Sequence, residues 1–422
     1  MNRRNFIKKI GLSIAVATIL APKELLAIQN TDEEIIIHLF CYGGADFRYM
    51  FAPLEEQKEL HNAYFENQLN LVSEDEYKNI EISGKNYNIK NTQVDGLEDM
   101  LKNSEVAIIP GVWFSDNRDH QHSIARNLLG DNDLYEKSTT ELDGWLGRLA
   151  GNMNQNAITS SNNWTFAART NSFPGSESIN ISKIRPFGIT NSTNVVSKAL
   201  QRYYNAETGE NASVMNLVNT ERTLKLFSDR VNDRLSNTNK IMTGVKASYL
   251  KKQIVNTFDA IDCRDIFNSN YFHIDFPGWD FHGNYKPISN SKIPDVFGEF
   301  GAIATIKKEM IKRGLWNNTT IIISSEFGRQ LKENGLKGKD HGHGNLMFIA
   351  GGSINGDIHG EIFPESEIPL WGKAGSDIEG KTMGYEIFGK VVENIKPGLG
   401  KILFPVFGTG KIEKDFDLYK NS

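Results

Sequence analysis

A short segment in the C-terminal third of the chain, which begins "SEFGR" and ends "DHGHG", carries several groups that could bind a metal ion. Glu326 ends an apolar run, and Asp340, His341 and His343 stand just before another. Carboxylate oxygens and imidazole nitrogens are common ligands of divalent ions. Glycines beside the histidines allow the backbone to turn tightly, so these side chains can converge. The segment therefore predicts part of a metal site, with Arg329 placed to bind an anionic group.

Similar groups follow three other apolar runs. Asp46 lies in "GGAD", His120 in "RDHQH", and Asp280 and His282 in "GWDFH". Ligands of open α/β sheets bind at the carboxyl ends of the strands, so we expect these segments to meet at one edge. Asp280 and His282 are two residues apart, which points both side chains to the same side of an extended backbone. The sequence predicts seven metal ligands: Asp46, Asp280, His282, Glu326, Asp340, His341 and His343.

Each motif also has a purely structural interpretation. Asp46 could cap a helix after the double glycine. Glu326 could form an ion pair with Arg329, and His122 could simply bond a neighbouring carbonyl. Asp280 could belong to a turn packed under the preceding indole. The gathering of five such clusters at predicted strand ends is what favours a metal site over these alternatives.

The elements that must position these residues are short, continuous apolar runs, which are typical of strands buried on both faces of a parallel sheet. The predicted strands are Glu34–Cys41, Glu105–Pro110, Asn270–Phe276, Thr319–Ser325 and Asn345–Ala350. Apolar residues at helical spacing predict a helix over Val296–Gly314. The alternation predicts one α/β domain from residue 28 to 422, with a mostly parallel sheet and a helical insertion at about 191–262.

The first 27 residues have the pattern of an export signal. Arg3 and Arg4 precede a short apolar segment that ends at Leu20, and cleavage is expected after Ala27. The paired arginines resemble the twin-arginine signal, which implies export of the folded protein by the twin-arginine translocation machinery, to the periplasm or otherwise out of the bacterial cytoplasm. An uncleaved amphipathic anchor is the alternative. The apolar segment is shorter than the roughly 20 residues of a membrane span, so we predict no stable transmembrane segment.

Charge and cysteine content narrow the functional classes. The 422-residue chain has a net charge of −5, and its first 27 residues carry five basic side chains and one acidic one, so the remainder carries −9. An acidic protein of this kind is not expected to bind nucleic acid, whose phosphates need a basic surface. The two cysteines, Cys41 and Cys263, allow at most one disulfide bond, and Cys41 is expected in the core.

The order of the motifs carries a resemblance to a known family. "GGAD", "RDH", "DGWLGRL", "GWDFH", "SEFGR" and "GKDHGHG" follow one another as in the family called domain of unknown function 1501, and the twin-arginine start fits it as well. That family is similar in fold to the alkaline phosphatase and sulfatase superfamily. The resemblance implies an alkaline phosphatase-like α/β/α sandwich with divalent metal at the strand ends: zinc, calcium or manganese.

The resemblance also implies roles for particular residues. Asp46 matches the first-strand aspartate that binds one ion, and Asp280 with His282 matches the pair that binds the other, completed by His341 or His343. Glu326 stands where the superfamily has an aspartate. The next position departs from the pattern, because Phe327 replaces a histidine ligand. The usual nucleophile is also missing: Ser115 and Ser123 lie in its region without a clear nucleophile context, and the pattern points to His120.

These observations predict an exported, metal-dependent hydrolase-like protein acting on phosphate or sulfate esters. His120 is the candidate general acid or base, and Arg329 the candidate group that stabilises charge on a transferred anion. The expected partner is a small anionic ester or a component of the cell envelope. Two alternatives remain: a metal-containing, non-catalytic binding or assembly protein with a degenerate site, and an envelope-binding module that stacks ligands on Trp113, Trp279 or Trp316.

Overall fold

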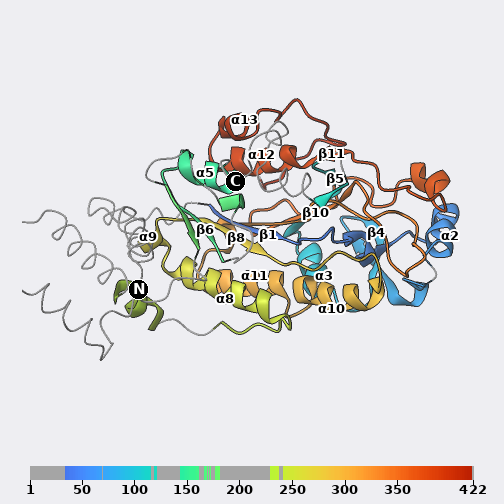
Figure 1. Ribbon diagram of the computed structural model, residues 1–422, viewed down its shortest axis with the longest axis horizontal. Helices are drawn as coiled ribbons and strands as arrows, with labels where there is room; N and C mark the ends of the chain where they lie inside the picture. Colours follow the sequence, from blue (N-terminus) through green and yellow to red (C-terminus); the bar gives the residue numbers. More distant parts are fainter. Residues whose placement is uncertain are drawn as a thin grey trace, which may run out of the picture.

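The computed structural model centres on one eight-stranded sheet, with the strand order β11-β5-β10-β9-β1-β8-β6-β7 (Figure 1). The structure describes residues 34–420 except 69, 116–117, 121–142, 161–165, 169, 171, 173–175, 181–228 and 237–240. The strands are β1 Ile35–Phe40, β5 Val106–Trp113, β6 Ala157–Thr159, β7 Ser178–Asn180, β8 Tyr271–Asp275, β9 Thr319–Ser324, β10 Asn345–Ala350 and β11 Thr382–Met383. All five predicted strands are present, with bounds that differ by up to three residues.

Strand direction brings the predicted clusters to one edge. Strands β9, β1, β8, β6 and β7 run parallel, whereas β10 runs antiparallel to both β9 and β5. The carboxyl ends of β5, β9, β1 and β8 therefore lie at the same edge as the beginning of β10. That is why groups that follow four strands and precede a fifth can meet.

The central strands are buried on both faces. In β1, Ile35, Ile37 and Leu39 belong to one hydrophobic cluster, while Ile36 and Phe40 belong to another. This alternation follows from the two-residue period of a strand. A strand with apolar side chains on both faces must be covered by a layer of structure on each face of the sheet. The continuous apolar run of β1 is the sequence pattern that such a strand requires.

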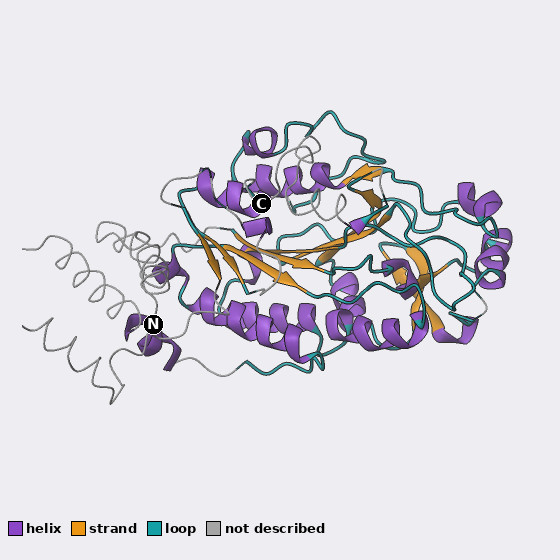
Figure 2. Ribbon diagram, in the orientation of Figure 1, coloured by secondary structure: helices purple, strands orange, loops and turns teal. Residues whose placement is uncertain are grey.

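Helices cover both faces of the sheet (Figure 2). One layer holds α3 Asp95–Lys102, α8 Ser248–Asp262, α10 Tyr285–Phe297 and α11 Ala302–Lys312, and the other holds α5 Trp145–Asn152, α12 Gly384–Ile395 and α13 Leu399–Leu403. The predicted α/β/α sandwich with a mostly parallel central sheet is confirmed.

The predicted helix at Val296–Gly314 is only partly correct, because the structure divides this segment. Helix α10 ends at Phe297, and α11 begins at Ala302. Gly298 donates to the carbonyl of Pro294 (3.1 Å) and Gly301 donates to Gly298 (2.9 Å). A Cβ on either glycine would lie 2.7 Å from the Pro294 oxygen. The chain therefore turns between the two helices at a point where only glycine fits.

A smaller antiparallel sheet, in the order β2-β4-β3, lies beside the main one. It was not predicted from the sequence. Its strands are β2 Phe51–Ala52, β3 Tyr77–Ile82 and β4 Lys85–Lys90, and the remaining short elements are α2 Lys58–Glu66, α9 Arg264–Phe267, and the 3₁₀ helices Phe47–Met50, Glu74–Glu76, Phe166–Ala168, Trp316–Asn318 and Glu365–Leu370.

Two sequence predictions fall wholly or partly outside the described residues. The predicted export signal at 1–27 lies outside them, and so do residues 191–228 and 237–240 of the predicted insertion. Within that insertion, α8 packs against β8 and α11. Cys41 and Cys263 are buried and unbridged, in agreement with the core position expected for Cys41. Among the helices that the structure describes, none combines the length and hydrophobicity needed to cross a bilayer.

Candidate metal centre

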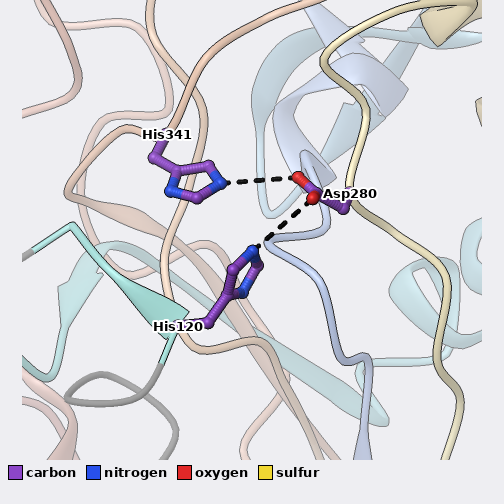
Figure 3. A group of neighbouring side chains, drawn as sticks. All are labelled: His120, Asp280 and His341. Carbon is purple, nitrogen blue, oxygen red and sulfur yellow. Dashed lines mark hydrogen bonds and ion pairs between the residues drawn. The ribbon is translucent and has the colours of Figure 1, made fainter.

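Three side chains from separate segments face one another at the carboxyl edge of the sheet (Figure 3). His120 follows β5, Asp280 follows β8, and His341 precedes β10. Each residue offers one ligand atom, and these atoms all lie within 4.8 Å of one another. The three segments are far apart in sequence, so the antiparallel direction of β10 is what allows His341 to join the other two.

The imidazole Nε2 atoms converge on the carboxylate of Asp280. His120 Nε2 lies 3.6 Å from Asp280 Oδ2, and His341 Nε2 lies 3.4 Å from Oδ1. His282 adds a third ring, with its Nε2 3.2 Å from Asp280 Oδ1 and 3.0 Å from His341 Nε2. Three imidazoles and one carboxylate make a donor set of the kind that binds zinc and related ions.

The opposite nitrogen of each ring is held by an acceptor. Nδ1 of His120 donates to Glu326 Oε1 (2.9 Å), and Nδ1 of His341 donates to the carbonyl of Arg118 (2.7 Å). Nδ1 of His282 donates to Asp340 Oδ1 (2.8 Å). A proton on Nδ1 leaves the lone pair on Nε2, directed at Asp280. This is the arrangement in which metal-binding histidines are held by neighbouring acceptors.

Glu326 lies beside His120 and holds its ring in place. Its Oε1 accepts hydrogen bonds from His120 and from the Gly43 amide (2.8 Å), and its Oε2 accepts from the Ser325 hydroxyl (3.0 Å). The hydrogen bond that His120 donates to Glu326 raises the pKa of His120 above its usual value, against the lowering effect of burial. The geometry makes Glu326 a positioning residue, whereas the sequence suggested a metal ligand.

Asp340 has a similar place beside His282. Its Oδ1 accepts from His282 Nδ1 and from the Asn334 amide (3.1 Å). The hydrogen bond with His282 is the main cause that lowers the pKa of Asp340, so this carboxylate stays ionised and acts as an acceptor. Asp340 thus orients a ring, in contrast to the direct ligand role that the sequence suggested.

Arg329 is turned inward. Its side chain is 0% exposed. It donates to the carbonyls of Gly44 (2.8 Å), Lys339 (3.0 Å) and Trp279 (3.0 Å), to that of Gly43, and to Asp280 Oδ1 (2.9 Å). The guanidinium therefore joins the loops after β1, β8 and β9. A group buried in this way is not available to an anionic substrate, so the predicted charge-stabilising role does not fit this geometry.

Burial tends to raise the pKa of Asp280, but the hydrogen bond from Arg329 and the charges of nearby basic groups bring it below its usual value. Asp280 is consequently an anion at neutral pH. Its side chain is 48% exposed, and that of His282 is 44% exposed. The centre is thus anchored on one side by a buried cation and open on the other.

Two other predicted ligands lie apart from this group. Asp46 is buried, and its Oδ2 accepts from Lys339 Nζ (2.8 Å) and from the Tyr285 hydroxyl (2.7 Å). The ring of His343 packs against Trp113, with a centroid separation of 5.1 Å. Consequently the structure brings together His120, Asp280, His282 and His341, supports them with Glu326, Asp340 and Arg329, and leaves Asp46 and His343 outside.

Sequence reasoning missed several supporting groups. The carbonyl of Arg118 accepts a hydrogen bond from His341, and the side-chain amide of Asn334 donates one to Asp340. The ring of Phe327 packs beside two of the imidazoles, with centroid separations of 4.5 Å from His341 and 5.0 Å from His120. Asn334 lies in the Glu-Asn-Gly turn of a loop already singled out, which was the available signal. Of the candidate nucleophiles, Ser115 is buried, and Ser123 falls outside the described residues together with His122.

The predicted family resemblance is confirmed over part of the chain. A family model described as a protein of unknown function (DUF1501) matches residues 267–364. This segment contains Asp280, His282, Glu326 and Arg329, together with the loop that carries His341. The match therefore includes most of the described centre, and the family's own description assigns it no activity. No curated protein matches the chain significantly.

Solved structures with some likeness include the lipoteichoic acid synthase LtaP from Listeria monocytogenes, at 9% identity and a TM-score of 0.35, covering 86% of this chain and 80% of that one. The periplasmic domain of EptC from Escherichia coli in complex with Zn has 12% identity and a TM-score of 0.30, with 87% and 84% covered. Ps i-CgsB in complex with a neocarrahexaose has 9% identity and a TM-score of 0.34, with 89% and 76% covered. These scores are too low to support an argument about this chain.

Proposed function

We propose that this protein is an exported, metal-dependent hydrolase that cleaves phosphate or sulfate esters. The observation that carries the proposal is the convergence of three imidazole Nε2 atoms on Asp280, each with its Nδ1 held by an acceptor. Three imidazoles and a carboxylate held in this way form a donor set that suits a divalent ion. The export part of the proposal rests on residues 1–27.

The donor set favours zinc over calcium or manganese. His120, His282 and His341 offer imidazole nitrogen, which suits zinc and other transition ions, whereas calcium prefers six to eight oxygen ligands. Asp280 supplies the one carboxylate among the converging groups. When bound, a divalent ion supplies a Lewis acid that polarises a phosphoryl or sulfuryl oxygen.

The protein's own groups have distinct tasks in this proposal. Asp280 and His282 lie on the exposed side, where a substrate oxygen can approach. Glu326 and Asp340 hold the rings of His120 and His282 in one orientation, which limits the reorganisation needed during the reaction. Arg329 holds the backbone of three loops around Asp280. Nε2 of His120 is among the atoms that would hold the ion, and its Nδ1 is bonded to Glu326, so the general acid or base role predicted for His120 does not fit this arrangement.

Turnover of p-nitrophenyl phosphate and p-nitrophenyl sulfate tests this function, with metal-stripped protein reloaded with Zn²⁺ or Mn²⁺. Asp280→Asn should lower kcat/KM by at least 100-fold, because it removes the charge on which the three rings converge. Asp99→Asn, on the exposed surface of α3, is the matched control and should leave turnover unchanged. Absence of turnover on both esters in protein that has bound metal would refute ester hydrolysis.

The burial of Arg329 favours a second candidate. The cation expected to stabilise an anionic group instead holds three loops together, which fits a metal-stabilised, non-catalytic assembly protein. In that case Zn²⁺ should raise the melting temperature of the wild type but not of Asp280→Asn, and neither protein should turn over either ester, because metal binding is coupled to folding alone.

A further inference from the structure

A buried ion pair stands beside the metal centre, on the side away from solvent. The side chains of Asp46 and Lys339 are 2% and 6% exposed, and Lys339 Nζ lies 2.8 Å from Asp46 Oδ2. The hydroxyl of Tyr285 donates to the same oxygen at 2.7 Å. Asp46 comes from the loop after β1, Lys339 from the loop before β10, and Tyr285 from the start of α10. Three elements are thus joined at one carboxylate.

The ammonium already provides the positive charge that a buried carboxylate requires. An isolated buried carboxylate is very costly, so Asp46 must be paired with a cation or protonated. Burial tends to raise the pKa of Asp46, but the charge and hydrogen bond of Lys339 lower it below its usual value. A divalent ion at Asp46 would have to lie against this ammonium, and the two positive charges would repel each other strongly in a buried setting.

Lys339 is also fixed through its backbone. Its amide donates to the carbonyl of Phe281 (3.0 Å), and its carbonyl accepts from Arg329 (3.0 Å). The next two residues are Asp340, which holds the ring of His282, and His341, which faces Asp280. A shift of Lys339 would therefore move both the support of one ring and a converging ring itself.

We propose that Lys339 is a built-in cation that takes the place of a second metal ion at Asp46 and fixes the loop bearing Asp340 and His341. The centre then holds one divalent ion, and the pair of Lys339 and Asp46 raises the affinity for that ion by positioning its surroundings. This inference rests on the proposed metal centre, and it differs from the sequence expectation that Asp46 binds a metal ion directly.

The test is a Zn²⁺ titration of the whole protein, with stoichiometry from elemental analysis and affinity from competition with a chelator. The wild type should bind one equivalent. Asp46→Asn and Lys339→Met should each retain one equivalent but bind it at least 10-fold more weakly, as expected for the loss of a group that positions ligands. Arg313→Met removes a partly buried cation that follows α11 and pairs with Asp262 (2.7 Å) at the end of α8, and should leave the affinity unchanged.

A single substitution leaves one buried charge alone and could prevent folding. The double variant Asp46→Asn/Lys339→Met removes both charges, so it should be more stable than Lys339→Met and still bind Zn²⁺ at least 10-fold more weakly than the wild type. Two equivalents in the wild type, with one lost in Asp46→Asn, would overturn the inference and leave the proposed function intact. Unchanged affinity in the double variant would also overturn it. No Zn²⁺ in folded wild type would instead reject the metal centre itself.

Discussion

At the scale of single residues, the support of the imidazole rings decides what the centre can do. Glu326 is the clearest case, since one buried carboxylate accepts from His120 Nδ1, from the Gly43 amide and from the Ser325 hydroxyl. This fixes both the proton position and the orientation of the ring. Glu326, which the sequence suggests as a metal ligand, therefore orients the ring of His120.

Glu326→Gln tests that task. The amide keeps the size of the side chain, but it lacks the charge that holds the proton on Nδ1, so the affinity for Zn²⁺ should fall by about 10- to 100-fold. Chelator competition measures the effect, with Glu333→Gln, whose carboxylate accepts hydrogen bonds from Asn70, as control. If Glu326 were itself a ligand, metal would be lost altogether, and if it had no part in the centre, the affinity would not change.

Arg329→Met distinguishes a structural arginine from a catalytic one. The substitution leaves four buried carbonyls without this donor, and such a loss typically costs about 3–5 kcal/mol of unfolding free energy. Urea denaturation should show a loss of this size. A variant with unchanged stability and a lowered kcat alone would instead support the substrate-binding role predicted from the sequence.

At the scale of elements, the sequence predicted where the strands lie and which ends carry reactive groups. Continuous apolar runs identify strands buried on both faces, and their order along the chain places His120, Asp280 and His341 at strand ends. The direction of β10 could not be predicted from the sequence, because an antiparallel strand within a mostly parallel sheet can have the same composition as its parallel neighbours.

The sequence also does not predict which way the side chains on the loops point. Strand alternation fixes which way a side chain points, but it ends where the strand ends. Asp46 and Arg329 were therefore assigned to the centre by position in the motif, whereas the structure turns Asp46 toward Lys339 and Arg329 toward backbone carbonyls. Lys339 had no sequence signal apart from its place beside Asp340.

The loop between β9 and β10 depends on close backbone contact. A Cβ at Gly342 would lie 2.5 Å from the carbonyl carbon of Arg329, whereas a Cβ at Gly335 in the same loop would have nothing within 4 Å. Gly342→Ala should therefore displace the neighbouring His341 and lower Zn²⁺ affinity at least 10-fold, while Gly335→Ala should not change it. Equal affinities in the two variants would show that the loop adjusts without cost to the centre.

At the scale of the whole molecule, stability should depend on pH through two histidines buried far from solvent. His38 and His273 lie at paired positions of β1 and β8, with ring centroids 5.2 Å apart. Burial lowers the pKa of His38 well below its usual value and lowers that of His273 to about 3. The unfolded chain therefore binds protons before the folded one as the pH falls below about 6.5.

The free energy of unfolding should accordingly fall between pH 6.5 and about pH 3. At pH 5, His273 alone should reduce it by about 2 kcal/mol relative to pH 7. Urea denaturation at the two pH values measures this loss, and His273→Leu should show a loss smaller by that amount. An identical pH dependence in the variant would contradict the assignment.

The most direct test of the metal centre is an anomalous difference map from crystals of the protein grown with Zn²⁺. The account predicts one strong peak, in contact with Nε2 of His120, His282 and His341 and with the carboxylate of Asp280, and no peak beside Asp46. A peak at Asp46, or a well-ordered crystal without a peak among these four side chains, would contradict it.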